Sequence, residues 1–140
     1  MRNFIVLVLA ALFLSACAGS KEIEFTSLNQ APCKDQAEMK TADEFVSETA
    51  ENLTVYQQGK IIYAAMDIRT YCNARITFDL EADQKIIKLK VRNASTQKDN
   101  CICITNVTTS FTNVEPGSYK VFVTNAAGNQ LLAESDLILQ

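Results

Sequence analysis

The residues of this chain best suited to chemistry are its five cysteines, because thiolates both bind soft metals and pair into disulfides. Cys17 directly follows an apolar N-terminal run, which leaves Cys33, Cys72, Cys101 and Cys103 for the body of the chain. Zinc sites made of four cysteines usually carry pairs spaced CxxC in turns. Here the closest pair is spaced CxC in a segment typical of a strand. We therefore expect disulfides rather than a bound metal, and no cofactor.

Two absences narrow the chemistry further. The chain of 140 residues has no histidine, which excludes Ser-His-Asp and Cys-His catalytic sets and the common zinc sites that contain histidine. It has four glycines and no glycine-rich loop that could cradle a phosphate. Its formal net charge of −3 provides no basic surface for a nucleic acid. We therefore expect neither nucleotide chemistry nor nucleic-acid binding.

The N-terminus has the parts of an export signal. Arg2 supplies a positive charge, and an apolar run from Phe4 to Leu14 follows it. This run has the length of the apolar part of a signal peptide and is too short for a spanning helix. Small residues at positions 15 and 16 precede the first cysteine. We therefore expect residues 1–16 to be removed on export.

The segment Leu14-Ser15-Ala16-Cys17 resembles the bacterial lipobox. This resemblance implies that a diacylglyceryl group is attached to the Cys17 thiol, that cleavage occurs before Cys17, and that the new N-terminus is acylated. Several acyl chains hold a protein stably on a membrane. The next residue is Ala18 rather than an aspartate, which in such lipoproteins favours the outer membrane of a Gram-negative cell.

In an exported chain the four remaining cysteines are expected to form disulfides. Cys101 and Cys103 point to the same face of one strand, so they are poorly placed to bond each other. Each therefore pairs with Cys72 or Cys33. The spacing leaves open which pairs with which, although Cys72 and Cys101 both lie near the start of a predicted strand. This favours a Cys72–Cys101 bond and leaves Cys33 for Cys103.

From residue 53 onward, apolar and polar residues alternate with the period of a β-strand. Segments 71–80 and 87–92 alternate on either side of a turn at 81–84, which predicts an antiparallel hairpin. Segments 53–56 and 60–68 predict another, and Pro116-Gly117 predicts a type II turn. About seven such strands predict an all-β fold, an antiparallel immunoglobulin-like β-sandwich. The residues expected to be buried are Ile76, Phe78, Leu80, Leu89, Val91, Val121 and Val123, and those expected to be exposed are Thr77, Lys88 and Lys90.

The chain therefore divides into a signal peptide (1–16), a lipid-anchored tether and acidic segment (17–52), and a β-sandwich domain (53–140). Within the tether, residues 23–28 predict at most a weak edge strand. Thr41 and Glu44 match a helix-capping box and predict a short helix that includes Phe45, Val46 and Ala50. The acidic residues Asp67, Asp79, Glu81 and Asp83 lack the glycine and the closing glutamate of an EF-hand loop, so we expect them on the polar faces of strands.

One stretch of the sequence resembles a known group of proteins. The order Cys72-Asn73-Ala74, an alternating hairpin, Cys101-Ile102-Cys103 and then Gly117-Ser118-Tyr119-Lys120-Val121 is similar to that of small Bacteroidetes lipoproteins. The similarity covers residues 62–125. It implies an immunoglobulin-like or transthyretin-like sandwich without an assigned activity. Members often carry a doubled cysteine or a histidine near the first site, and this chain has Cys72-Asn73 and no histidine there.

These observations predict a non-enzymatic binding or structural module, anchored to a membrane through Cys17 and located in the cell envelope. No two carboxylates stand out as a catalytic pair. The alternatives are a small carboxylate- or metal-dependent envelope enzyme, and an accessory subunit of a larger envelope complex. The identity of the protein or glycan ligand is not encoded in any motif of the sequence.

Overall fold

The computed structural model describes residues 22–39 and 47–140, and these residues form strands but no helix. The strands are β1 (Glu24–Gln30), β2 (Lys34–Glu38), β3 (Thr49–Gln58), β4 (Ile61–Tyr71), β5 (Ile76–Asp83), β6 (Ile86–Asn93), β7 (Cys101–Thr112), β8 (Gly117–Thr124) and β9 (Leu131–Leu139). In this described part of the chain, no helix has the length and apolarity needed to span a bilayer.

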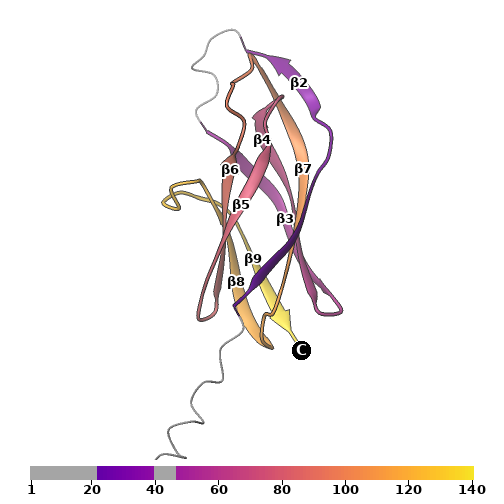
Figure 1. The fold of residues 1–140 in the computed structure, drawn as a ribbon, viewed down its shortest axis with the longest axis vertical. Coiled ribbons are helices and arrows are strands. Elements are labelled where there is room, and N and C mark those ends of the chain that lie inside the picture. The colour runs from indigo at the N-terminus through magenta and orange to yellow at the C-terminus, as the bar shows by residue number, and fades with distance from the viewer. Residues whose placement is uncertain (1–21, 40–46) are drawn as a thin grey trace, which may run out of the picture.

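The strands form two facing sheets, which confirms the predicted all-β sandwich (Figure 1). One sheet has five strands in the order β1-β7-β4-β3, with β2 also paired to β7, and the other has four in the order β5-β6-β8-β9. All pairs are antiparallel except β6 with β8. That pair is parallel because the chain crosses to the five-stranded sheet and runs back along β7 before it returns as β8.

The core lies between the two sheets and comes from the alternation that the sequence shows. The inward residues of β4 are Ile62, Ala64, Met66 and Ile68, and all of them are buried. From the facing sheet they meet apolar residues that are also buried, Ile87, Leu89, Val91, Val121, Val123, Leu137 and Leu139. Burial of apolar surface at roughly 25 cal/mol per Å² is the main favourable term for such a fold.

The predicted hairpins are present, with one shift of boundary. β3 pairs with β4, and β5 pairs with β6 around a turn at residues 84–85. Cys72 and Ala74 were expected on the strand that contains Phe78, but they lie in the connection between β4 and β5. A hydrogen bond from the amide of Ala74 to the carbonyl of Tyr71 (2.9 Å) closes a tight turn there. The strand is therefore interrupted at this turn, although the alternation of apolar and polar residues continues across it in the sequence.

The sheet begins earlier than the predicted domain start at residue 53. β1 and β2 pair with β7, and β3 starts at Thr49, so much of the segment expected as a tether is part of the sandwich. Ala50, which the helix prediction included, is buried in β3. The rest of that predicted helix, at positions 41–46, lies outside the described residues, as do the signal peptide and Cys17.

Burial follows the prediction at five of the seven residues expected to be buried, and it differs at the three expected to be exposed. Ile76, Leu89, Val91, Val121 and Val123 are buried, but Phe78 and Leu80 are only half-buried. The reason is that β5 has a hydrogen-bonded neighbour on one side only. Thr77, Lys88 and Lys90 were expected to be exposed and are half-buried. Lysine stems commonly lie along apolar surface while the ammonium group stays in water.

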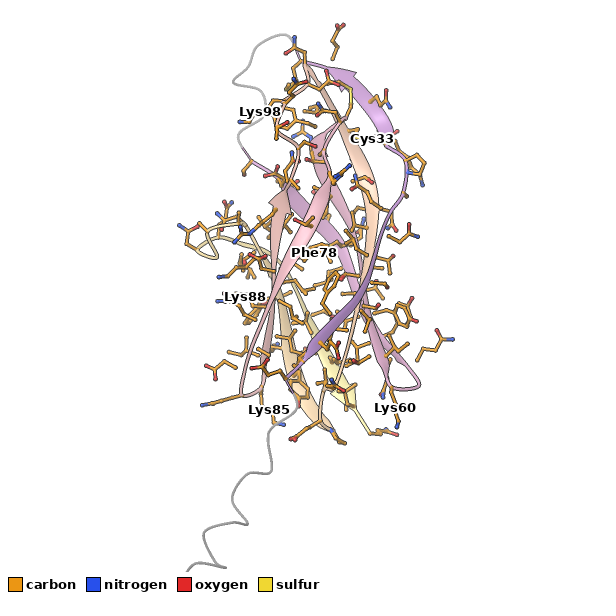
Figure 2. All side chains as sticks on the ribbon, viewed as in Figure 1. Cys33, Lys60, Phe78, Lys85, Lys88 and Lys98 are labelled. Atoms are coloured by element: carbon orange, nitrogen blue, oxygen red, sulfur yellow. A yellow bond between two sulfur atoms is a disulfide. The ribbon has the colours of Figure 1, made fainter. Side chains whose placement is uncertain are left out.

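The two ends of the sandwich differ in what they carry. The start of β1, the β3–β4 and β5–β6 turns and the C-terminus lie at one end, which we call the tether end (Figure 1). The start of β7, the end of β4 and β2 lie at the opposite end, which we call the cysteine end. Lys60 and Lys85 are at the tether end, whereas Lys98 is toward the cysteine end (Figure 2).

Candidate functional site

Two disulfides lie at the cysteine end. Cys72 is bonded to Cys101, and Cys33 is bonded to Cys103, with Cα–Cα separations of 5.4 and 5.6 Å. This is the pairing that the strand positions favoured. Disulfide bonds were expected for an exported chain, and the structure has them. Cys103 is buried, whereas the other three sulfur-bearing residues are half-buried.

The β-ladders bring the four cysteines together. Cys103 is opposite Thr70 in the β4–β7 ladder, and Cys72 donates its amide to the carbonyl of Cys101 (2.9 Å) just beyond the end of that ladder. The sulfur atoms of Cys33, Cys72 and Cys103 lie within 4.8 Å of one another, which is close enough for shared metal ligation. Metal ligation requires thiolates, and each of these sulfur atoms is bonded in a disulfide. The cysteines therefore fasten the β1–β2 segment and the β4–β5 turn to β7.

Three acidic residues of the four-stranded sheet form ion pairs with lysine or arginine side chains of the neighbouring strand. Asp79 pairs with Arg92, and Glu81 pairs with Lys90, each from β5 to β6. The hydrogen bond from Lys90 lowers the pKa of Glu81. Such exposed pairs contribute little to stability. They agree with the expectation that these carboxylates lie on polar strand faces, and they do not gather with Asp67, which lies on the other sheet.

A different group of side chains gathers on the outer face of the five-stranded sheet. Because residues opposite each other in an antiparallel ladder point to the same side, the register defines this face. Residues between the buried positions of β4 point outward, and their ladder partners on β3 and β7 lie beside them. We call the following set the outer face: Tyr56, Tyr63, Ala65, Asp67, Asn106 and Thr108.

Asp67 is the centre of a hydrogen-bond network on the outer face. Asn52 donates through Nδ2 to one carboxylate oxygen (2.9 Å), and Asn106 donates through Nδ2 to the other (3.1 Å). These two bonds lower the pKa of Asp67 below its ordinary value of 3.8, with the bond from Asn52 the larger cause. The carboxylate is therefore ionised at neutral pH. Each of its oxygens keeps a lone pair for a further donor.

A β-bulge places Asn52 beside Asp67. The β3–β4 register shifts between Glu51 and Thr54, and Asn52 has a positive φ of 55°. Asparagine is among the few residues besides glycine that adopt this backbone conformation readily. Bulges commonly redirect a side chain next to a functional site. Here the bulge turns the Asn52 amide toward the carboxylate of Asp67.

Beside Asp67 there is a small hollow of about 80 Å³. Its walls combine charged, amide and apolar groups, Thr49, Glu51, Asn52, Asp67, Arg69 and Ile104. Ile104 points outward from β7 and has 37% of its surface exposed. The hollow has room for a group of a few non-hydrogen atoms. It offers that group both donors and acceptors next to an apolar wall.

At the other end of the outer face, two tyrosines stack across β3 and β4. The ring centroids of Tyr56 and Tyr63 are 5.2 Å apart, with an angle of 14° between the ring planes. Tyr56 has 45% of its surface exposed. Ala65 lies between Tyr63 and Asp67 on the outward side of β4, opposite Thr108 on β7. The outer face therefore carries an aromatic pair and a polar network separated by small and hydroxylated side chains.

Two larger hollows lie at the ends of the sandwich. One, of about 550 Å³ at the tether end, is lined by Leu80, Tyr119, Glu22 and Glu115 among others. Both glutamates are exposed to solvent. The other, of about 580 Å³, is lined by the connections at 73–75 and 94–97 and by Gln30. Gln30 bonds the carbonyl of Ala74 and the amide of Ile76, so it serves to hold the β4–β5 connection.

Comparisons of this chain with protein-family models, with curated proteins and with solved structures give no match.

Sequence reasoning found the cysteines but not the outer face. Of the outer-face residues only Asp67 was weighed as a possible ligand, as a component of a calcium site, and that reading was set aside. The alternation of β4 places Tyr63 and Asp67 on one side of the sheet, and this could be predicted from the sequence. The contacts of Asp67 with Asn52 and Asn106 could not be predicted. The contact with Asn52 depends on a bulge, and Asn106 is 39 positions away from Asp67 in the chain.

Proposed function

We propose that this chain is a lipid-anchored, non-enzymatic binding module of the cell envelope, held through Cys17 and presenting the outer face to a ligand. The supporting observation is the outer face itself, where an ordered Asn52–Asp67–Asn106 network and an exposed tyrosine pair lie on one rigid sheet. Tyrosine and asparagine side chains are typical of recognition surfaces, because they combine large contact area with adaptable hydrogen bonding.

The anchor and the sandwich fit together geometrically. Cys17 is five positions before Glu22, the first described residue, and β1 starts at Glu24 at the tether end. Five extended residues span at most about 17 Å. A lipid on Cys17 therefore keeps the tether end within that distance of the membrane, and the orientation we propose has the cysteine end pointing away from it and the outer face accessible. The absence of an aspartate after Cys17 supports the outer membrane as the location.

The lipid anchor is tested by metabolic labelling with radioactive palmitate in a Gram-negative host. The wild-type chain is expected to incorporate label and to sediment with outer-membrane vesicles. Cys17→Ser is expected to lose both, whereas the nearby Ser20→Ala variant keeps both. Label that persists in Cys17→Ser, or a wild-type chain without label, contradicts the anchor.

The carboxylate-dependent enzyme remains the alternative, and the tether-end hollow with Glu22 and Glu115 is where it would be sought. A carboxyl group that acts as a general acid typically lies in an apolar, buried setting, and both glutamates are exposed. If the purified protein hydrolyses a glycan or ester substrate and Glu115→Gln abolishes this activity, the binding-module proposal is wrong.

A further inference from the structure

We propose that the outer face binds an N-acetylated amino-sugar chain, with sugar rings against the Tyr56–Tyr63 pair and an acetamido group in the hollow beside Asp67. This inference deepens the proposed binding function and rests on it. It requires a ligand that is recognised through side chains alone. The outer face belongs to β3, β4 and β7, and β4 and β7 are paired on both edges. A peptide therefore cannot add as a strand to β4 or β7, and the unpaired edge of β3 lies at the margin of the outer face rather than over it.

The charges of the outer face favour a ligand without strong charge. Glu51 and Asp67 are balanced by Arg69 and by Lys34, which is opposite Ile104 in the β2–β7 ladder. Most of the other outward groups are tyrosines, amides and threonine hydroxyls. The face has no basic cluster for a polyanion. A chain of sugar rings is complementary to these aromatic, amide and hydroxyl groups. The C–H faces of the rings pack on exposed aromatic rings, and their hydroxyl groups exchange paired hydrogen bonds with amides and carboxylates.

The spacing of these groups suits an extended glycan rather than a single sugar. Tyr63 and Asp67 are four residues apart on β4, which corresponds to about 13 Å along the strand. Ala65, between them, leaves room above the sheet for a sugar ring. One ring on the tyrosine pair and the next toward Asp67 then lie along β4. A free monosaccharide could reach only one of the two groups.

The hollow beside Asp67 identifies the substituent. An acetamido group has an N–H donor, a carbonyl acceptor and a methyl group. Asp67 keeps lone pairs for the N–H, Arg69 at the rim supplies N–H donors for the carbonyl, and Ile104 provides an apolar wall for the methyl group. The ionised state of Asp67, maintained by the lowered pKa, provides a strong acceptor at neutral pH. A plain hexose has a hydroxyl group at that position, which can still donate to Asp67, but it lacks the carbonyl acceptor and the methyl group.

The test uses the full lipidated protein purified in detergent and calorimetric titration with two soluble probes. Chitopentaose and cellopentaose share the same backbone linkage and differ in the acetamido group. We expect chitopentaose to bind and cellopentaose to bind about tenfold more weakly or not at all, because a site with polar groups built for one substituent discriminates against its absence. Equal affinity for both sugars overturns the acetamido assignment, and no binding of either overturns the whole inference.

Three variants connect the binding to the outer face. Asn52→Gly keeps the positive φ while it removes the amide, Asp67→Asn removes the charge, and Tyr56→Ala removes one ring. Each is expected to weaken chitopentaose binding by about tenfold or more, with an unchanged circular dichroism spectrum. The matched control, Asp136→Asn, removes an exposed carboxylate from the opposite sheet and is expected to bind like the wild type. Wild-type affinity in all three variants overturns the inference.

Pull-down on insoluble polymers distinguishes the sources of such a chain. Retention on chitin and on purified peptidoglycan sacculi, but not on cellulose, supports the inference for an envelope glycan, and retention on chitin alone supports it for an external polysaccharide. Retention on envelope fragments that is abolished by protease but not by lysozyme identifies a protein partner and overturns the inference.

Lipid labelling separates the failure of this inference from the failure of the proposed anchor. A labelled chain that binds no glycan refutes only this inference, and an unlabelled chain that binds chitopentaose refutes only the anchor.

Discussion

The carboxylate of Asp67 is held in place by its neighbours although it is only half-buried. Its neighbours Asn52 and Asn106 each donate one amide hydrogen bond, so the side chain is fixed in one orientation before any ligand arrives. Fixing a side chain in advance reduces the entropy that binding would otherwise cost. Asn52 is itself fixed by the bulge in β3. The backbone of the sheet therefore fixes the positions of all three side chains. The contribution of Asp67 to stability should depend on pH in a predictable way.

We expect the stabilising effect of Asp67 to be lost in acid. Its pKa is lowered in the folded protein, so its contribution is present at pH values above the unfolded-state pKa and declines as the pH falls through the folded-state pKa. In urea unfolding, Asp67→Asn should therefore be less stable than the wild type at pH 7, and the difference should shrink toward pH 3. The control Asp136→Asn should show a smaller difference at pH 7. A difference for Asp67→Asn that stays constant with pH contradicts the assignment.

Individual strands were predictable wherever one face is buried. The alternation in β4, β6 and β8 has a buried partner at each inward position, so the period of two appears directly in the sequence. Edges and connections were less predictable. Phe78 has the same pattern as a core residue but lies on an edge strand, and Cys72 continues an alternation across a turn. β1 and β2 carry a weak pattern because most of their residues are exposed.

Two phenylalanines allow this distinction between core and edge to be measured. Phe111 on β7 is fully buried, with 0% of its surface exposed, whereas Phe78 on the edge strand β5 is half-buried. We expect Phe111→Ala to cost about 3–5 kcal/mol of unfolding free energy, as for a phenylalanine in a packed core. Phe78→Ala is expected to cost about 1–2 kcal/mol, since much less apolar area leaves water there. Equal losses in urea unfolding would show that β5 is covered as well as β7.

At the scale of the whole molecule, the two ends of the sandwich are stabilised in different ways. The tether end is closed by short turns at 59–60 and 84–85. The cysteine end carries a longer connection at 94–100 and the β1–β2 segment, which disulfides attach to β7. A domain of this size gains from covalent support because its core alone supplies limited stability.

The disulfides are expected to contribute unequally because they close loops of different length. Cys72 and Cys101 are separated by 29 positions, and Cys33 and Cys103 by 70. The chain-entropy estimate gives about 3.5 kcal/mol for the shorter loop and about 4.5 kcal/mol for the longer one. When each pair is replaced with serines, urea unfolding should therefore give a lower free energy of unfolding for the Cys33/Cys103 variant than for the Cys72/Cys101 variant. The opposite order would mean that the β4–β5 turn depends on its disulfide more than the β1–β2 segment does.

The proposed anchor also predicts how the molecule stands on a membrane. Lys60 and Lys85 are in the turns of the tether end, and Lys98 is toward the cysteine end (Figure 2). If the lipid on Cys17 holds the tether end against the bilayer, these two lysines lose access to a water-soluble acylating reagent when the protein is placed in vesicles, while Lys98 keeps it. We expect mass spectrometry of acylated peptides to show slower modification of Lys60 and Lys85 than in the unlipidated Cys17→Ser chain mixed with the same vesicles. Protection of Lys98 in place of these two would show that the domain folds back so that its cysteine end faces the membrane. Protection of none of the three would show that the tether holds the domain clear of the surface, because exposed lysines are modified at rates set by their access to water.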